Sequence, residues 1–241
     1  MADLAFDPPA PCPVCKGFGF LETPDGRRVV PCACKAGEHS SARMRGARIP
    51  DRYRGCSLAN FNTLHPSQAA AKALARRFIE SWPVVGAGLL IVGPVGRGKT
   101  HLATAILAEI VDARQARGIF CDTTELLDRI QATFSRSEET ADDVLTPFKE
   151  AEIMVLDELG ARRPTEWGRD TLYALLNARY NQRRITLVTT NFMDEGDRAG
   201  AETLESRIGV PLRSRLAEMC QYVPLDGPDF RREVKQGRAF A

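Results

Sequence analysis

No stretch of this sequence is long and apolar enough to cross a membrane, and neither sign of charge is in large excess. The longest mostly apolar segment, Val84–Val92, is far shorter than the ~20 residues of a transmembrane helix. The first eight residues have neither a basic start nor an apolar run, so we expect no secretory signal. Lysine and arginine number 33 against 31 acidic residues, and the net charge of +2 does not by itself indicate a nucleic-acid binder. We therefore expect a cytoplasmic protein without membrane contact.

Cysteine is sparse over most of the chain and concentrated near its start. Four of the seven cysteines lie within the first 34 residues, whereas Cys56, Cys121 and Cys220 occur singly and are expected to pack as small apolar side chains. In a reducing compartment, a cluster of this kind indicates a metal site rather than disulfides.

The clustered cysteines form one Cys-x-x-Cys pair, Cys12 and Cys15, and one Cys-x-Cys pair, Cys32 and Cys34, with 16 residues between the pairs. Two such pairs can supply the four thiolates of a tetrahedral structural zinc. A turn at residues 23–26 predicts a small zinc ribbon-like unit. Unliganded thiols and an iron–sulfur cluster are the alternatives, and His39 could replace one ligand.

Composition divides the chain into three parts. Residues 1–35 form the cysteine-rich unit with zinc as its expected metal, residues 36–50 are a small, polar and basic linker, and residues 51–241 are the main domain. Five arginines lie between Ser41 and Cys56 against a single acid, Asp51. This stretch would contact phosphate or an acidic partner, or else form a solvated linker.

From residue 51 onward, short apolar runs alternate with helical patterns. Strands are expected at residues 89–92, 118–121, 153–156 and 185–190, with a fifth near 221–223. Helices are expected at residues 67–82, 99–117, 123–134, 142–150 and 165–183, the third of them with a threonine as its N-cap. The alternation predicts an α/β fold in which helices cover both faces of a five-stranded parallel sheet.

One glycine-rich segment carries the strongest chemical signal, Gly93-Pro94-Val95-Gly96-Arg97-Gly98-Lys99-Thr100. It follows a strand and opens a helix, which is the context of a P-loop. Glycines let the backbone approach phosphates, and the N–H groups at the helix start point at them. Lys99 would reach the β- and γ-phosphates of ATP and Thr100 would ligate Mg²⁺.

Two further strands end in polar residues that suit this site. Asp157 and Glu158 follow the apolar run 153–156, and Asn191 follows the strand 185–190. Ligands of open α/β sheets bind at the carboxyl ends of strands. Asp157 would hold Mg²⁺ through water, Glu158 would activate the attacking water, and Asn191 would lie beside them near the γ-phosphate.

With the segments 49–54, 58–61, 205–216 and 223–231, these motifs resemble the AAA+ P-loop ATPases of the DnaC/DnaI/IstB group of helicase loaders and transposition helpers. The resemblance covers roughly residues 48 to 232. It implies that Asn191 is the sensor residue and that Arg215 is the arginine finger that reaches a neighbour's ATP. Arg207 and Arg213 are alternatives for the finger.

Most AAA+ modules continue into a helical lid, but only about 17 residues follow Pro224 here, so we expect no C-terminal lid domain. The ATP pocket would then stay open until a neighbouring subunit closes it. The resemblance thus implies self-association through the ATP site.

The resemblance implies an ATPase that loads a replicative DNA helicase hexamer, docks through its zinc-bearing N-terminus and contacts single-stranded DNA. Residues 124–150 lie where related initiators insert DNA-binding helices, with Arg129, Arg136 and Lys149 as candidates for DNA contact or as ordinary surface charges. An IstB-like transposition helper is the nearest alternative, although such helpers usually lack the cysteine unit. A zinc-bearing ATP switch without turnover is the second, and a small-molecule kinase is disfavoured because no acceptor-binding segment is visible.

Overall fold

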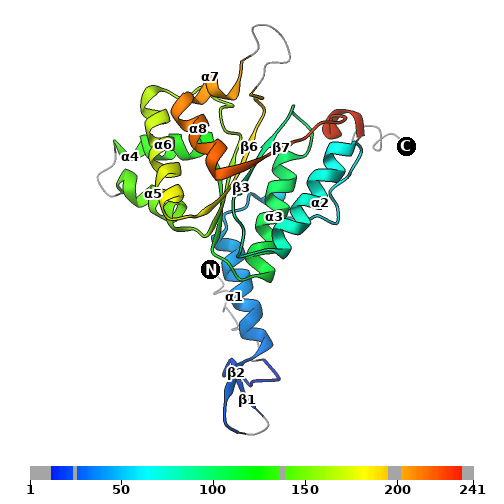
Figure 1. The fold of residues 1–241 in the computed structure, drawn as a ribbon. Helices are drawn as coiled ribbons and strands as arrows, with labels where there is room; N and C mark the ends of the chain where they lie inside the picture. Colours follow the sequence, from blue (N-terminus) through cyan, green and yellow to red (C-terminus); the bar gives the residue numbers. More distant parts are fainter. Residues whose placement is uncertain (1–11, 24–25, 136–138, 195–201, 235–241) are drawn as a thin grey trace, which may run out of the picture.

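The computed structural model of the chain describes residues 12–23, 26–135, 139–194 and 202–234, and the side chains of Pro31, residues 36–39 and Val234 lie outside that description. Figure 1 shows a broad α/β body from which one helix projects as a narrow stalk, with a small hairpin at its far end.

A five-stranded sheet, in the order β4-β5-β6-β3-β7, forms the centre of the body, and all neighbouring strands are parallel. The strands are β3 (Gly88–Val92), β4 (Gly118–Asp122), β5 (Ile153–Asp157), β6 (Ile185–Thr190) and β7 (Cys220–Pro224). Every residue of β3 and β5 is buried, as expected for strands covered on both faces. The predicted α/β fold with five parallel strands is confirmed.

Helices cover both faces of the sheet (Figure 1). One face carries α2 (Pro66–Glu80) and α3 (Lys99–Ala113), and the other carries α4 (Thr123–Thr133), α5 (Ala141–Glu150), α6 (Glu166–Asn181), α7 (Leu204–Ile208) and α8 (Val210–Met219). Side chains of β3 alternate between the two resulting cores, with Leu89 and Ile91 in one and Leu90 and Val92 in the other. Among the described helices, none combines the length and the apolar character of a membrane span.

The N-terminus of α4 corrects one expectation, because its cap is an aspartate. The Asp122 carboxylate accepts hydrogen bonds from the backbone N–H groups of Thr124 at 2.9 Å and Glu125 at 3.0 Å. Strand β4 ends at Asp122, so this carboxylate already stands where the first free N–H groups of the helix emerge. The threonine N-cap was therefore the wrong prediction.

The expected linker is largely helical. Residues 33–46 form α1 (Ala33–Gly46), the stalk of Figure 1, followed by the short 3-10 turn η1 (Asp51–Tyr53). The carboxyl end of α1 is seated on the body: the backbone N–H of Phe120 donates to the Ala47 carbonyl at 2.7 Å, Ala47 is buried, and Ser40 hydrogen-bonds to Asp112 of α3.

Three of the five arginines near the stalk contact the chain itself. Arg54 pairs with Asp51 at 2.8 Å, and the guanidinium groups of Arg48 and Arg52 lie over the rings of Phe148 and Tyr53 respectively. Of these three contacts, the one between Arg48 and Phe148 joins the segment after α1 to the body, and the other two are local.

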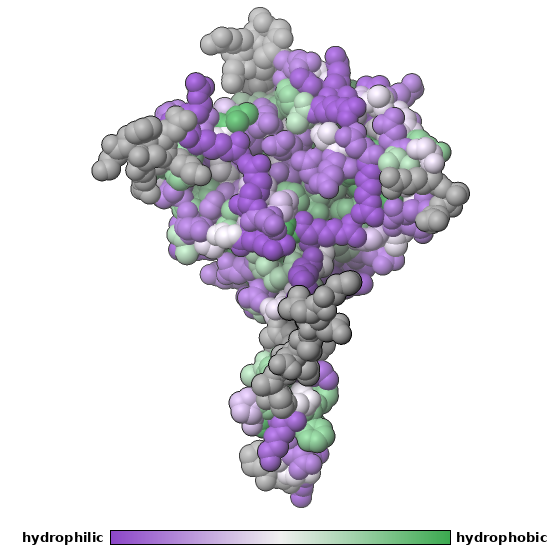
Figure 2. Space-filling model, turned by 180° about the vertical axis from the view of Figure 1, so that it is seen from behind, coloured by the Kyte–Doolittle hydropathy of each residue, from purple (hydrophilic) through white to green (hydrophobic). Residues whose placement is uncertain are grey.

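At the free end of the stalk, β1 (Phe20–Glu22) and β2 (Val29–Pro31) pair as an antiparallel hairpin, in agreement with the expected ribbon. Pro24 and Asp25 of its predicted turn lie outside the described residues. Large apolar side chains are exposed on this small unit: Val14, Phe18, Phe20, Val29 and Val30. Phe18 alone is 80% exposed. Figure 2 shows hydrophobic residues on the surface of this end of the molecule.

Candidate functional site

The glycine-rich loop between β3 and α3 has the backbone geometry of a phosphate cradle. Gly93, Gly96 and Gly98 all have positive φ angles, of 153°, 81° and 93°. A Cβ on Gly96 would collide with the Asp229 carboxylate, and one on Gly93 would collide with the Leu225 carbonyl. No side chain caps α3, so its first N–H groups are left for a ligand. These features fit a bound triphosphate.

Lys99 is the first residue of α3 and lies beneath this loop. Its Nζ donates a hydrogen bond to the carbonyl of Pro94 at 2.7 Å. Burial lowers the pKa of Lys99 to about 8, against the opposing effect of the Asp157 and Glu158 carboxylates, and the positive charges of Arg231 and Arg97 lower it further. A phosphate bound nearby would add negative charge and so raise the pKa of Lys99 again.

Asp157 lies opposite, at the end of β5, and meets Thr100 directly. The Thr100 hydroxyl donates to Asp157 Oδ1 at 2.9 Å, and the buried Thr189 hydroxyl donates to the same oxygen at 2.6 Å. Burial raises the pKa of Asp157, an effect that the two hydroxyl donors oppose. A hydroxyl and a carboxylate at this spacing are hard oxygen donors of the kind that Mg²⁺ prefers.

A single cavity of about 380 Å³ joins the remaining predicted residues, Glu158 and Asn191, to the P-loop. Glu158, Thr189 and Asn191 line it from the strand ends, and residues 95–101 line it from the loop and α3. The structure therefore brings the P-loop, Asp157, Glu158 and Asn191 to one place. The volume is within the usual range of small-molecule sites.

The segment before α2 forms another wall of the cavity, and its role was not assigned from the sequence. The lining includes Tyr53, Asn60 and Phe61. The Phe61 ring packs against Gly98 and lies edge-on to His101, with ring centroids 5.5 Å apart. Flat apolar surface of this kind suits a nucleotide base.

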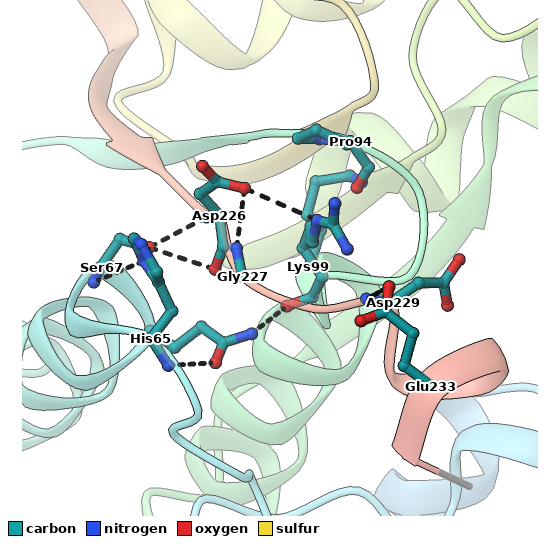
Figure 3. A network of polar contacts seen from close by, with 10 residues as sticks. His65, Ser67, Pro94, Lys99, Asp226, Gly227, Asp229 and Glu233 are labelled. Atoms are coloured by element: carbon teal, nitrogen blue, oxygen red, sulfur yellow. Dashed lines mark hydrogen bonds and ion pairs between the residues drawn. The ribbon is translucent and has the colours of Figure 1, made fainter. Parts of the chain in front are cut away.

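The segment after β7 closes the cavity from the opposite end of the chain. Phe230 and Arg231, in the helical turn η2 (Phe230–Val234), line it, and the Phe230 N–H donates to the Gly96 carbonyl at 3.1 Å. In Figure 3, Asp226 lies between Ser67 at the start of α2 and the P-loop. Its backbone N–H donates to the Ser67 hydroxyl at 2.9 Å, and its carboxylate lies 3.7 Å from Arg97 Nε. We call residues 225–233 the C-terminal strap.

Sequence reasoning missed Arg231 as a site residue. It stands in the closing segment that carried part of the family resemblance, but only the fold shows that this segment returns to the P-loop. Within the described ranges, the chain continues from β7 into the strap and η2, and no lid domain is formed there.

None of the three candidate finger residues lines the chain's own cavity. Arg215 of α8 lies over the Tyr180 ring, 4.1 Å from its centroid, and 3.5 Å from Glu218. Arg213 is held by a two-pronged contact with Asp194, and Arg207 pairs with Glu202. The role of Arg215 stays a prediction that requires a second subunit.

Two of the three DNA-contact candidates have acidic partners of their own. Arg129 pairs with Glu139 at 2.8 Å and Lys149 pairs with Asp142 at 2.6 Å. Arg136 lies outside the described residues.

The four N-terminal cysteines converge on one point at the end of the stalk. Their sulfur atoms all lie within 4.8 Å of one another, with 3.9 Å between Cys12 and Cys32 and 3.4 Å between Cys15 and Cys34. Four sulfurs bound to one zinc at about 2.3 Å would be about 3.8 Å apart. The donor set and the spacing fit a tetrahedral metal site. The side chain of His39 lies outside the described residues.

Comparison with known proteins agrees with this geometry. Residues 34–237 match the family described as "IstB-like ATP binding protein". The chain belongs to this family. With its P-loop and five-stranded parallel sheet, it has the AAA+ fold of the DnaC/DnaI/IstB group, as the sequence motifs predicted.

Related proteins carry several names. The replicative helicase loader DnaC of Escherichia coli is 24% identical over 139 residues, 58% of this chain and 56% of that protein. This chain is also 30% identical to y4iQ/y4nD/y4sD of Sinorhizobium fredii, which is named "Putative insertion sequence ATP-binding protein". That match extends over 126 residues, 52% of this chain and 41% of the relative. The chain thus spans about half the length of these two relatives. XkdC of a phage-like element in Bacillus subtilis is 26% identical over 223 residues, 87% of this chain and 79% of that protein.

Among solved structures, a crystal structure of the DnaC helicase loader superimposes with a TM-score of 0.65 and 30% identity, over 73% of this chain and all of that one. The AMPPCP-bound replication initiator DnaA of Aquifex aeolicus has a TM-score of 0.62 at 16% identity, over 80% and 56% of the two chains. The second match establishes only a shared fold.

Proposed function

We propose that this protein is an ATP-dependent loader of a replicative DNA helicase, acting in the cytoplasm as a self-associating ATPase. The observation that carries the proposal is the pairing of two separate sites in one chain. A P-loop cavity with both acids in place lies in the body, and a four-cysteine unit with exposed apolar side chains stands at the end of a helical stalk.

For hydrolysis, the chain's own groups divide the work. Lys99 and the N–H groups of the P-loop would hold the β- and γ-phosphates. Thr100 and, through water, Asp157 would hold Mg²⁺, which neutralises charge on those phosphates. Glu158 would accept a proton from the attacking water, and Asn191 would position that water against the γ-phosphate. Arg231, in the strap, brings a further positive charge to the cavity.

A second subunit would complete the site. Arg215 lies outside its own cavity, on α8, with its guanidinium over the Tyr180 ring. A guanidinium supplied from that neighbour would stabilise charge on the γ-phosphate in the transition state. Hydrolysis would then depend on assembly, and the state of the nucleotide would report whether subunits are in contact.

The zinc-bearing unit would be the part that docks on the helicase hexamer. Its five exposed apolar side chains have no core to enter, because a unit of about 24 residues is too small to form one. Zinc, held by the four thiolates, would fix the backbone that presents them. Single-stranded DNA would bind the body, with the α4–α5 face and its Arg129 and Lys149 as the contact region.

Affinity capture from cell extract tests this proposal. The wild-type protein with ATP should recover a hexameric replicative helicase, identified by mass spectrometry. A Cys32→Ser/Cys34→Ser variant should lose it, and a Cys220→Ser variant is the matched control for loss of a thiol elsewhere. Recovery of a transposase in place of a helicase would contradict the loader assignment.

An IstB-like transposition helper is the second candidate, and the family match and the Sinorhizobium fredii relative favour it. Such a helper would assemble on duplex DNA and present it to a transposase. The four-cysteine unit, which lies almost wholly before the matched residues 34–237, favours the loader instead.

A zinc-bearing adaptor that binds ATP as a switch without significant turnover is the third candidate. Glu158 stands in the cavity with the other P-loop partners, which favours turnover. Steady-state phosphate release distinguishes the two: a protein that binds ATP and releases no phosphate, alone or with helicase and DNA, would be the adaptor.

A further inference from the structure

The hydroxyl of Thr189 is buried between the two acids of the ATP site. It donates to Asp157 Oδ1 at 2.6 Å, and it accepts the backbone N–H of Glu158 at 3.0 Å. The residue is 0% exposed and sits near the carboxyl end of β6, beside β5. One hydroxyl therefore contacts both the expected magnesium-binding acid and the expected catalytic acid.

The Glu158 backbone needs this partner. Its φ angle is +55°, in the left-handed region that non-glycine residues rarely adopt. Glu158 lies just beyond the end of β5, and the Thr189 hydroxyl on the neighbouring strand β6 accepts its N–H. The next N–H, of Leu159, donates to the Thr189 carbonyl at 2.9 Å. Thr189 thus holds the turn that aims the Glu158 side chain.

The bond to Asp157 has a direction as well. A hydroxyl has one proton to donate, and here it is hydrogen-bonded to the carboxylate of Asp157. The hydroxyl oxygen is therefore free to accept a hydrogen bond from the backbone N–H of Glu158. Thr100 also donates to Asp157, at 2.9 Å, but its hydroxyl would turn to the metal when Mg·ATP binds. Thr189 is then the side chain that keeps the Asp157 carboxylate oriented.

We propose that Thr189 is a positioning residue that couples the metal-binding acid to the catalytic acid. The proposal rests on the ATPase function proposed above. It also includes Asn191, which lies two residues further along the chain from Thr189 and lines the same cavity. If Asn191 contacts the γ-phosphate, the end of β6 would move. The Thr189 hydroxyl would then transmit this movement to both acids.

Three variants test the role. Thr189→Val keeps the shape and removes the hydroxyl, and Thr189→Ser keeps the hydroxyl. Thr190→Val is the matched control, because Thr190 is equally buried in β6 but its hydroxyl contacts Leu159 and Phe192 instead of the acids. Thermal unfolding shows that each variant is folded before ATP affinity, turnover and the half-saturating Mg²⁺ concentration are measured.

Turnover by Thr189→Val should fall about 10–100-fold, the size of effect that a small displacement of catalytic groups produces. ATP affinity should stay within about threefold, since the P-loop contacts are intact, and the half-saturating Mg²⁺ concentration should rise several-fold. Thr189→Ser should restore the turnover and the half-saturating Mg²⁺ concentration, and Thr190→Val should leave both near wild type.

Wild-type turnover and Mg²⁺ dependence in Thr189→Val would overturn the proposal. So would a serine variant as slow as the valine variant, or an equal loss in Thr190→Val. Failure of the ATPase function is a separate result, because it would appear as absent turnover in the wild-type protein under every condition.

Discussion

The body and the cysteine unit of this chain differ in the side chains that they bury. In the body, strands bury apolar side chains on both faces of the sheet, and two cores result. In the unit at residues 12–35, large apolar side chains point to solvent while four thiols meet inside. The body has two cores of its own, whereas we expect the unit to depend on a metal held by its four thiols.

This difference implies that the two regions can be disrupted separately. The stalk α1 belongs to the body, because it contacts α3 and β4 and because Ala47 and Ile49, just after its carboxyl end, are buried. Loss of the metal should therefore stop at the stalk. Damage to the sheet should leave the cysteines able to bind zinc.

Zinc removal should have the largest effect. Structural zinc contributes about 10–16 kcal/mol to the folding of comparable small units, so chelation or Cys32→Ser/Cys34→Ser should unfold residues 12–35 while the body's thermal transition moves little. Metal analysis should find about one zinc per chain in the wild-type protein. Absence of zinc, or collapse of the body on chelation, would contradict the separation.

The next largest effect is expected where ATP turnover by the body depends on a neighbouring subunit. Arg215→Ala should bind ATP nearly as well as wild type and lose up to about 10³-fold in turnover, the lower end for arginine fingers. Mixing it with Lys99→Ala should restore activity, because an intact P-loop can then pair with an intact finger. If oligomers form and mixing restores nothing, Arg213 and Arg207 become the next residues to test.

The body can also be weakened directly at Arg179. This guanidinium is fully buried, and it donates to the carbonyls of Phe148 at 2.6 Å and Ala151 at 2.8 Å and to the Thr186 hydroxyl at 2.9 Å. Burial lowers its pKa to about 9. Arg179→Met should lower the free energy of unfolding by about 2–4 kcal/mol, because buried acceptors lose their donor.

Chemical denaturation measures that change, with the exposed Arg183→Met as the matched control. The zinc content should be unchanged in both variants. An Arg179→Met protein that releases zinc as it loses stability would show that the two regions fold together.

The smallest effect is expected at the strap. Arg231→Ala should weaken ATP binding about 3–10-fold, since one partly solvated charge near phosphate contributes on the order of 1 kcal/mol. The neighbouring Arg232→Ala, which does not line the cavity, is the control. Equal affinities in all three proteins would exclude a role for the strap in binding nucleotide.

The sheet and the P-loop could be predicted because their signals are local. Apolar runs mark the strands, and the spacing of Gly93, Gly98 and Lys99 is fixed by the phosphate they surround. Asp157 and Glu158 followed from their place after an apolar strand. Four cysteines in two close pairs likewise needed no tertiary information to be grouped.

The remaining features depend on contacts between distant segments. Helix α1 contains two glycines and consists mostly of small or polar residues, and it is held by contacts with α3 and β4. Periodicity therefore did not reveal it. Arg231 enters the site because the strap folds back over the P-loop. The Thr189 hydroxyl reaches Asp157 and Glu158 only because β6 lies beside β5 in the sheet. The sequence of β6 alone does not show this contact.

The central claim is that the body turns over ATP with Glu158 as the catalytic acid–base group. Nucleotide titration and phosphate release should be measured together on wild type, Lys99→Ala and Glu158→Gln. Lys99→Ala should fail to bind ATP, whereas Glu158→Gln should bind with wild-type affinity and release phosphate about 10²–10⁴-fold more slowly. Equal turnover in Glu158→Gln and wild type would contradict the account.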